Sequence, residues 1–536
     1  MKKIKLILSA SAISLLFVSC NNYLDINEDP NNIHVENLTP ELILPGVITE
    51  MYRVQSGDEM QLGSLMMNNW AANTYTYGNP YGAEFTLSAV NSKFYDGIWD
   101  STYKNLYNFK IIEDYANADH KQDNYIAVAK ILKAFYMQTI VDLYGDVPYS
   151  DAWKGYNNAT PKYDNDEEVY KALFNSLDDG IAIIDEENEH AEDITSVDIV
   201  FGGDMQKWKA FANTIKLRYL VRMAKTTGAM ATFRDEKLAE LAGSNPAFIT
   251  DNVFEKPGYS TANNDALNPL IFNYRADSGG NDVQNFKVIT VSEHFANVLE
   301  GNAILNSSDY AKYTGIKDPR RYSYFTRVAA YNRLKGIRQG ATAGQPGAEL
   351  DPTNPASRLV SSFATPTFTG SATGGLFALG NARGGSLMTL AEANFLMAEA
   401  ALRWPSLFSF SAQDKFNSGV TSSIAYFGGT GAAAYVTSIS SVPGLGWAGS
   451  NEQKLEAIIT QKWLALSHVN AIETFIEYNR TGYPFTPLAT TAIMSNKPYR
   501  LQYPQSEFSA NSANTPNIPT GSLFTKNQYT PFWNQN

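Results

Sequence analysis

The feature that most restricts the fold is a set of long helical apolar patterns that occur in neighbouring pairs. Residues 90–118 and 124–144 carry large apolar side chains three or four positions apart, and a short polar turn separates them. Because this spacing places the apolar side chains on one face of a helix, we expect the two segments to pack as an antiparallel hairpin. The arrangement recurs at 166–185 with 205–224, at 387–404 with 412–427, and at 451–466 with 469–478.

Four such pairs predict a mainly α fold of four tetratricopeptide-like helical hairpins. Tetratricopeptide units are stacked helix pairs in which each unit covers the apolar face of its neighbour. Ala391, Ala398 and Ala401 fall at expected contact points, where small side chains let helix backbones approach closely. We therefore expect one domain over residues 40–536, with hairpins at about 90–225 and 387–480.

The segment at about 243–385 differs from the hairpins on either side of it. It is rich in Gly, Asn, Ser, Thr and Pro and shows little periodicity. A stretch of this length without regular structure is unusual in a compact domain, so it is either disordered or a functional, loop-built subdomain. Interleaved aromatic residues, among them Tyr259, Phe272 and Tyr322, favour an ordered subdomain that the hairpins support.

The N-terminus has the pattern of an export signal. A short basic start precedes the apolar run 6–18, which is too short to be a permanent membrane anchor. Cys20, the single cysteine of the chain, follows at once in a pattern that resembles the bacterial lipobox, with Phe17 where Leu is usual. We expect a signal peptide over 1–19, a lipid on Cys20 and a polar tether over 20–39. The alternative is a plain signal peptide and a chance cysteine.

The composition restricts the possible partners. The net charge of -12 and the pI near 5.1, without a basic cluster, argue against nucleic acid as a partner. No later segment offers about 20 uninterrupted apolar residues, so none is expected to span a membrane. The supply of 31 Tyr and 8 Trp implies that many rings lie near the surface, where they can serve as flat contact platforms.

The chain lacks the common signatures of catalysis, of metal binding and of cofactor binding. The five histidines are scattered, and no zinc, nucleotide or nucleophile-elbow motif is present. The acidic run 164–168 begins like a calcium loop but lacks the glycine at its sixth place. A capping box of Asp164 and Glu167 explains it better. We expect no metal and no cofactor.

Paired carboxylates raise the possibility of a glycosidase. Glu392 and Glu399 lie on one predicted helix, and Glu473 and Glu477 lie on another. Glycoside hydrolysis uses such pairs. We expect ion pairs that orient the hairpins instead, since Arg480 stands three residues after Glu477 and can pair with it on one helix face.

Two loops are the predicted ligand contacts. A sugar ring offers an apolar face that an aromatic ring can cover and a hydroxyl rim that polar side chains can satisfy. The first predicted set is Trp70, Asn73, Tyr75, Tyr77 and Tyr81, and the second is Tyr274, Arg275, Asp277 and Asn281. The alternative for both sets is packing between loops. Trp99, Trp208 and Trp463 fall within helical faces and are expected in the core.

Three longer strings resemble a known family. They are DLYGDVPYSDA at 142–152, LMTLAEANFLMAEAALRW at 387–404 and QKWLALSHVNAIETFIEYNRTGYP at 461–484. With the lipobox and in this order, they resemble the SusD/RagB family of nutrient-binding outer-membrane lipoproteins, and the first string is closest to the SusD-like type 2 branch. In the third string, a single Arg480 stands where many members have paired arginines.

The resemblance implies a function without catalysis. The protein would be lipid-anchored in the outer membrane and exposed at the cell surface. It would capture a nutrient, commonly an oligosaccharide, and pass it to a SusC-type TonB-dependent β-barrel transporter. The alternatives are a secreted all-helical glycan hydrolase, or a surface adhesin or peptide-binding lipoprotein.

Overall fold

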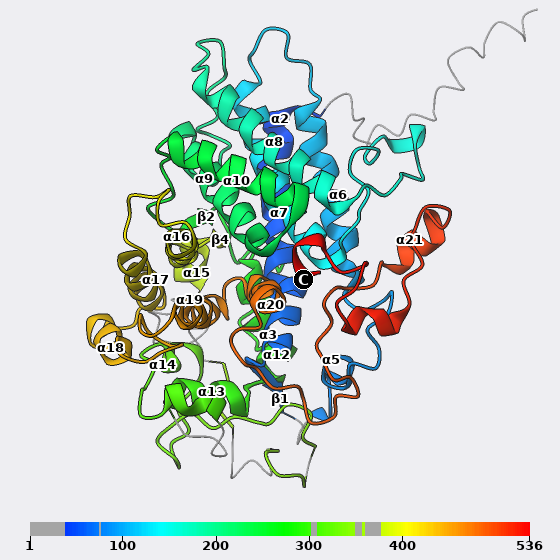
Figure 1. Ribbon diagram of the computed structural model, residues 1–536. Coiled ribbons are helices and arrows are strands. Elements are labelled where there is room, and N and C mark those ends of the chain that lie inside the picture. Colours follow the sequence, from blue (N-terminus) through cyan, green and yellow to red (C-terminus); the bar gives the residue numbers. More distant parts are fainter. Residues whose placement is uncertain are drawn as a thin grey trace, which may run out of the picture.

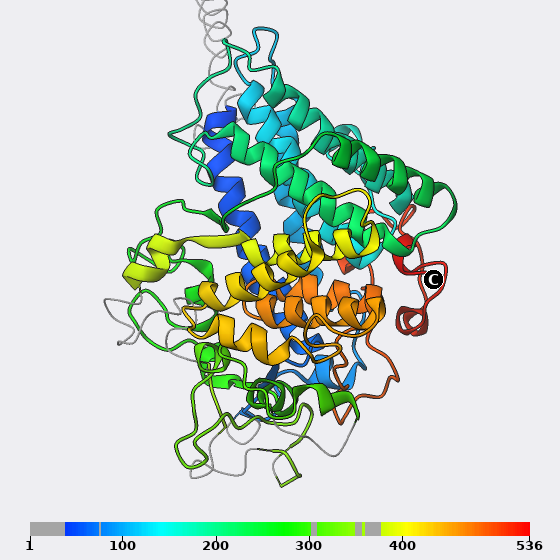
Figure 2. The same cartoon turned by 60° about the vertical axis from the view of Figure 1, so that its left-hand side comes forward.

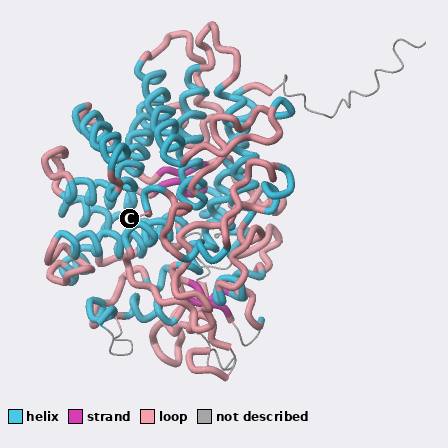
Figure 3. Tube along the Cα trace, turned by 45° about the vertical axis from the view of Figure 1, so that its right-hand side comes forward, coloured by secondary structure: helices cyan, strands magenta, loops and turns pink. Residues whose placement is uncertain are grey.

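The computed structural model describes residues 38–73, 77–301, 308–342, 344–348, 356–359 and 377–535. Helices fill the upper part and the left side of the molecule in Figure 1, and the lower end consists mostly of loops. Figure 3 shows that the strands are few and short. The mainly α class is therefore confirmed, while the tetratricopeptide-like character of the hairpins stays a prediction.

The upper layer is built from helices of the N-terminal half of the chain. They are α2 (Pro40–Val54), α6 (Asp96–Glu113), α7 (Asp123–Tyr144), α8 (Asp166–Asp185), α9 (Met205–Arg222) and α10 (Gly228–Gly243). Each of α6 to α9 packs against the next, and α2 packs against α6 and α7. Helix α6 begins later than predicted because Tyr95, directly before it, has a left-handed backbone with φ 55°. Helix α10 was not predicted.

The second group of helices lies beneath this layer, in yellow and orange in Figure 2. It comprises α16 (Leu390–Arg403), α17 (Ala412–Tyr426), α18 (Ala432–Ile439), α19 (Asn451–Leu466) and α20 (Ala471–Thr481). Helix α16 packs against α17, α19 and α9, so it joins the two groups. Helix α19 begins with a capping box, in which Ser450 and Gln453 satisfy each other's backbone N–H.

The capping box predicted at the start of α8 is wrong. The capping residue is Asn165, whose side chain accepts a hydrogen bond from the Glu167 N–H at 3.1 Å. The Asp164 carboxylate instead accepts from the backbone N–H groups of Tyr149 at 2.9 Å and Ser150 at 2.7 Å. Asp164 therefore fixes the turn that follows α7 rather than the helix that follows Asp164.

The described part of the loop-rich segment is ordered. It contains β2 (Val253–Glu255), α11 (Pro269–Tyr274), α12 (Gln284–Val288), β3 (Ile289–Val291), α13 (Glu293–Glu300), the 3-10 helix η5 (Ser308–Tyr313), α14 (Arg321–Tyr324) and α15 (Phe377–Arg383). Two antiparallel strand pairs fasten it to the helices. Strand β1 (Trp70–Ala72) pairs with β3, and β2 pairs with β4 (Gly385–Met388).

The remaining elements are short. They are the π-helical turn η2 (Gln55–Glu59), α3 (Met60–Met66), α5 (Gly82–Thr86), α21 (Gln505–Ala510), and the 3-10 helices η3 (Gly155–Asn157), η4 (Met223–Lys225), η7 (Thr520–Phe524) and η8 (Phe532–Asn534). Within the described ranges, no helix combines the length and the apolar character that crossing a membrane requires. Trp99, Trp208 and Trp463 are buried in the core, as predicted.

A buried ion-pair network joins the two groups of helices. The Arg222 guanidinium of α9 is fully buried and pairs with Asp142 of α7 at 3.1 Å and with Glu473 of α20 at 2.6 Å. It also pairs with Glu477, which in turn pairs with Arg480.

The acidic residues of this network have a structural role. Arg480 also bridges to Glu399 of α16 at 2.7 Å. Burial alone would raise the pKa of Glu473, but the charges of Arg222 and Lys462 lower it. Glu473 therefore stays ionised and paired. The predicted ion pairs are confirmed, and their role in orienting the hairpins stays a prediction. Glu392 is also buried, with its carboxylate 3.7 Å from Arg218.

Candidate ligand-binding site

The aromatic residues predicted at the first loop are mostly in the core. Trp70 is fully buried in β1, and its indole N–H donates to His468 Nε2 at 2.9 Å. Tyr81 is also buried. Neither ring offers a face to a ligand in this structure, so the expected stacking on Trp70 and Tyr81 is corrected to core packing. Trp70 is buried because it lies in strand β1, where its ring packs edge-on against Tyr274 with 5.1 Å between ring centres.

The other residues of this loop differ in exposure. Asn73 is buried, and its backbone N–H donates to the Val288 carbonyl at 2.8 Å, so it extends the contact between this loop and α12. Tyr77 is 36% exposed and keeps an accessible ring. Tyr75 lies outside the described residues.

The second predicted set is divided between the core and the surface. Tyr274 is buried, and its hydroxyl donates to the Gly57 carbonyl at 2.9 Å. Arg275 is buried as well, paired with Asp282. Core packing therefore replaces the expected ligand contact for these two. Asp277 and Asn281 form an exposed turn, in which the Asn281 N–H donates to Asp277 Oδ1 at 2.8 Å. The two sets meet through Trp70 and Tyr274, in the core rather than at a surface.

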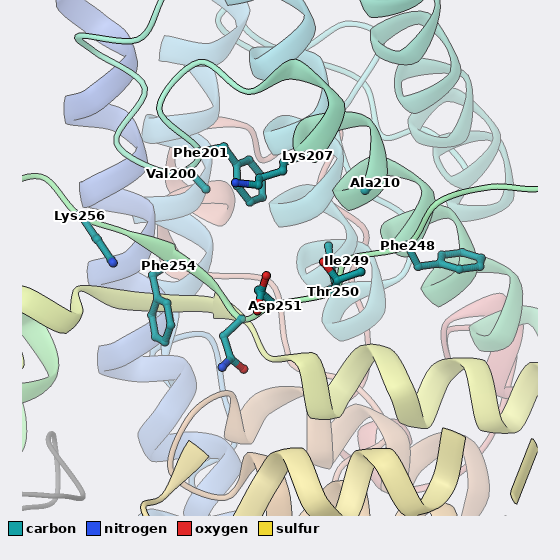
Figure 4. A pocket seen from close by; sticks show the side chains of 11 residues that line it. Val200, Phe201, Lys207, Ala210, Phe248, Ile249, Thr250, Asp251, Phe254 and Lys256 are labelled. Atoms are coloured by element: carbon teal, nitrogen blue, oxygen red, sulfur yellow. The ribbon is translucent and has the colours of Figure 1, made fainter. Parts of the chain in front are cut away.

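One hollow lies between the start of α9 and the segment that leads into β2. Figure 4 shows the residues that line it. Its volume is about 220 Å³. Lys207 and Lys256 line it together with the rings of Phe201 and Phe254. The Lys256 ammonium lies 5.8 Å from the centre of the Phe254 ring. Among the described lining residues, no buried side-chain nitrogen or oxygen lacks a hydrogen-bond partner, so nothing in this hollow requires a ligand.

A second hollow has the features of a ligand site, and we call it the Phe485 pocket. Its volume is about 330 Å³. The lining residues are Asn68, Glu293, His294, Tyr310, Arg338, Gln339, Phe485, Pro487, Leu488 and Thr490. They come from the end of α3, the start of α13, η5, the stretch beyond α14 and the loop that follows α20.

Hydrogen bonds between distant segments hold the pocket in shape. The Asn68 amide donates to the Pro487 carbonyl at 2.9 Å, and the Thr490 N–H donates to the Gln339 carbonyl at 3.0 Å. The buried Gln339 amide donates to the carbonyls of Leu65 at 2.9 Å and Trp70 at 2.6 Å. The pocket is therefore pre-formed, which lowers the entropic cost of binding.

Two buried polar atoms in this pocket have no hydrogen-bond partner among the described residues. They are Nε2 of His294 and Oδ1 of Asn68. The other ring nitrogen of His294, Nδ1, is 2.8 Å from the Tyr310 hydroxyl. Burial, together with the charges of Lys497 and Lys312, lowers the pKa of His294 to about 3. The imidazole is therefore neutral at pH 7, and in either tautomer Nε2 can form one hydrogen bond with a ligand.

An exposed ring stands beside these polar atoms. Phe485 is 44% exposed, which is unusual for so large an apolar side chain. Its ring meets the Tyr310 ring edge-on, with 6.1 Å between ring centres. Glu293 and Arg338 add a charged pair at 2.7 Å. An apolar face next to unpartnered hydrogen-bonding groups matches the two-sided chemistry of a sugar ring.

The described lining lacks the paired carboxylates of glycoside hydrolysis. Among the described lining residues, Glu293 is the one carboxylate, and Arg338 neutralises it. Hydrolysis of this kind uses two carboxyl groups on opposite sides of the scissile bond. The described lining can therefore bind a ligand, and it offers a single carboxylate that is already paired with Arg338.

One group of possible metal ligands lies elsewhere in the described residues. Atoms of His120, Asp123 and Glu186 lie within 4.8 Å of one another. Asp123 already accepts hydrogen bonds from Asn117 at 2.6 Å and Asn188 at 3.3 Å. These contacts give the carboxylate a structural role at the start of α7.

Sequence reasoning missed the Phe485 pocket because its walls are far apart in the chain. Asn68 and Phe485 are separated by more than 400 residues, and neither lies in a binding motif. A large apolar residue between two prolines, Pro484 and Pro487, was the one local signal. A ring in such a turn has few neighbours to cover it.

The comparisons with known proteins identify the family of the chain. A SusD-like family model, described as "Starch-binding associating with outer membrane", matches residues 30–504. The chain belongs to the SusD-like family. The description names binding and no reaction, which agrees with a binding protein rather than an enzyme. None of the curated proteins compared with the chain matches it.

Solved structures show the same fold over nearly the whole chain. A chitin-binding SusD homologue from Flavobacterium johnsoniae is 25% identical, with a TM-score of 0.66 over 92% of this chain and 98% of that chain. A SusD homologue from Bacteroides uniformis is 23% identical, with a TM-score of 0.64 over 92% and 99%. One from Bacteroides thetaiotaomicron is 21% identical, with a TM-score of 0.63 over 93% and 100%.

Proposed function

We propose that this SusD-like protein binds an oligosaccharide in the Phe485 pocket and passes it to a SusC-type TonB-dependent transporter. One observation carries the proposal: an exposed aromatic ring stands beside two buried polar atoms that have no hydrogen-bond partner among the described residues. The family description as starch-binding and the chitin-binding homologue support a glycan as the ligand.

Binding would follow from the two-sided chemistry of the pocket. The apolar face of a sugar covers Phe485, while its hydroxyls bond to His294 Nε2 and Asn68 Oδ1. Burying the ring contributes about 1–2 kcal/mol at roughly 25 cal/mol per Å². After the cost of association, a few such contacts give affinities from about micromolar to millimolar. Weak binding suits a protein that must release its ligand to a transporter. The exposed Tyr77, Asp277 and Asn281 stay proposed as further contacts.

Phe485→Ala tests the pocket. We expect it to raise the Kd for the bound oligosaccharide by about ten-fold, because the apolar platform is lost. The thermal midpoint should change little, since the ring is already half in water. Calorimetric titration with chito- and malto-oligosaccharides measures the affinity.

The control for this experiment is Ile493→Ala. Ile493 lies in the same loop, is 66% exposed and does not line the pocket. Equal affinity of wild type and Phe485→Ala for every bound sugar would place the site elsewhere. Release of reducing ends during the incubation would favour the hydrolase instead. Binding of host proteins without any sugar response would favour an adhesin.

We also propose that Cys20 carries a lipid anchor, that residues 1–19 are removed and that 20–39 tether a single domain over 40–536. Residues 1–37 lie outside the described ones. The family's association with the outer membrane supports the anchor. Cys20→Ser is expected to abolish the incorporation of labelled fatty acid and to move the protein from the membrane fraction to the soluble fraction. Membrane residence that survives this change would contradict the anchor.

The proposed transporter partner has its own test. Affinity purification of the tagged, full-length protein from gently solubilised outer membranes should recover a TonB-dependent β-barrel. The Phe485→Ala variant should recover it equally well, because the pocket and the barrel contact are proposed as separate features.

A further inference from the structure

A strongly basic stretch lies next to the Phe485 pocket. Of the 22 residues from Lys317 to Arg338, seven are Lys or Arg and one is acidic, in a chain with a net charge of -12. We call residues 317–338 the basic hairpin. The expectation that the chain has no basic cluster is therefore wrong here, because the acidic total conceals a local excess of positive charge.

Backbone pairing fixes this hairpin beside the pocket. Val328 and Arg333 form an antiparallel bridge that closes its turn. Ile337 forms a parallel bridge with Ser292, directly before α13. The next residue, Arg338, lines the Phe485 pocket. The hairpin includes α14 and lies at the loop-rich lower end of the molecule in Figure 1.

Two tyrosine rings hold three of its cations in place. The guanidinium groups of Arg321 and Arg327 lie 4.5 and 4.6 Å from the centre of the Tyr322 ring. The Lys335 ammonium lies 5.1 Å from the centre of the Tyr331 ring, which is 43% exposed. Stacking on a ring orients a guanidinium while leaving its N–H edge able to donate.

Some cations of the hairpin are paired with carboxylates, and three exposed ones have no ion pair with a described residue. Arg320 pairs with Asp318 at 2.6 Å, and Arg338 pairs with Glu293. The exposed Lys317, Arg327 and Arg333 have no ion pair with any described residue, and the one hydrogen bond shown for the Arg327 guanidinium goes to the neutral amide of Asn332, at 2.8 Å.

We propose that the basic hairpin binds the carboxylate or sulfate groups of an acidic oligosaccharide, another part of which occupies the Phe485 pocket. The proposal rests on the proposed function and narrows its ligand class. Arg338 is five positions after Arg333 in the chain, so the two positions are at most about 18 Å apart. One oligosaccharide can therefore span both surfaces. Carboxylate and sulfate groups match the forked donors of arginine.

The test compares matched acidic and neutral sugars. Oligogalacturonides and their fully methyl-esterified forms have the same chain and differ in charge. Wild type is expected to bind the acidic form about ten-fold more tightly at low salt. This preference should decrease as salt is added, because the charges involved are exposed. The double variant R327Q/R333Q should lose the preference and keep the affinity for the esterified form.

The matched control is K93Q/K162Q. It removes the same charge from two exposed lysines outside the hairpin and the pocket lining, so it should retain the preference. Equal binding of acidic and esterified oligomers by wild type would overturn the basic-hairpin proposal and leave the proposed function intact. If none of the chito-, malto- and galacturonate oligomers binds wild type, both proposals are contradicted.

Two other anionic partners are separate outcomes. Vesicles of phosphatidylglycerol and a single-stranded oligonucleotide are tested in parallel with the sugars. One of these partners could bind wild type but not R327Q/R333Q, while wild type shows no preference for acidic over esterified oligosaccharides. The hairpin would then bind a lipid surface or nucleic acid, and the assignment to acidic sugar would be wrong.

Discussion

Arg222→Met is expected to lower the free energy of unfolding by about 3–5 kcal/mol, the range for removing one partner from a buried ion pair. The substitution would leave the carboxylates of Asp142, Glu473 and Glu477 buried without their shared cation. The penalty arises from these uncompensated charges more than from the lost attraction. Chemical denaturation followed by circular dichroism measures it.

Two further variants make this result interpretable. Arg222→Lys keeps the charge, but a lysine ammonium lacks the planar donor fork with which the guanidinium contacts three carboxylates. We therefore expect an intermediate decrease in the free energy of unfolding. Lys171→Met removes an exposed pair with Glu168 and should cost no more than about 1 kcal/mol. If Arg222→Met and Lys171→Met cost the same, the network does not hold the helix groups together.

The second large effect concerns acid stability and His468. Burial lowers the pKa of His468 to about 3 from its ordinary 6.5, and its Nε2 accepts the Trp70 indole hydrogen bond. The unfolded chain therefore binds a proton that the folded chain excludes, and stability is lost as the pH falls from 6.5 towards 3. At pH 4.5, two units below 6.5, the loss from this one side chain is about 2–3 kcal/mol.

His468→Gln isolates this contribution, since a glutamine oxygen can also accept from Trp70 and does not titrate. The decrease in the free energy of unfolding between pH 7 and 4.5 should be smaller by about 2–3 kcal/mol in this variant. His190→Gln is the matched control, because it removes an exposed imidazole without opening the core. An unchanged pH dependence in His468→Gln would show that acid sensitivity comes from other groups.

The helical frame was predictable because its signal is local. Apolar side chains at helical spacing predicted α8 at Asp166–Asp185 without error and α7 within one residue of Asp123. Helix α10 was missed because few of its residues are buried, among them Leu238 and Leu241, so its apolar pattern is weak. A helix was therefore predictable where one of its faces is buried, because burial requires the periodic apolar side chains that the sequence analysis detects.

The ligand site was less predictable because the exposure of a ring is not a local property. Trp70 was expected to be a platform, yet it pairs in β1 with Val291, more than 200 residues away, and this pairing places it in the core. Phe485 had no comparable partner strand, and its ring stays half in water. The sequence shows which loops are rich in aromatic residues. Contacts between distant segments, such as the β1–β3 strand pairing, decide which of these rings stay exposed.

The Phe485 pocket also has a consequence for biosynthesis. Its first wall, at Asn68, is translated early, while the wall formed by Phe485 and Thr490 arrives when the chain is nearly finished. A truncated chain that stops before residue 485 lacks the ring face of the pocket, and it also lacks core residues such as Tyr503, which packs against Trp99. We therefore expect the proposed pocket to form only in the completed polypeptide, and a premature stop codon late in the gene to abolish it.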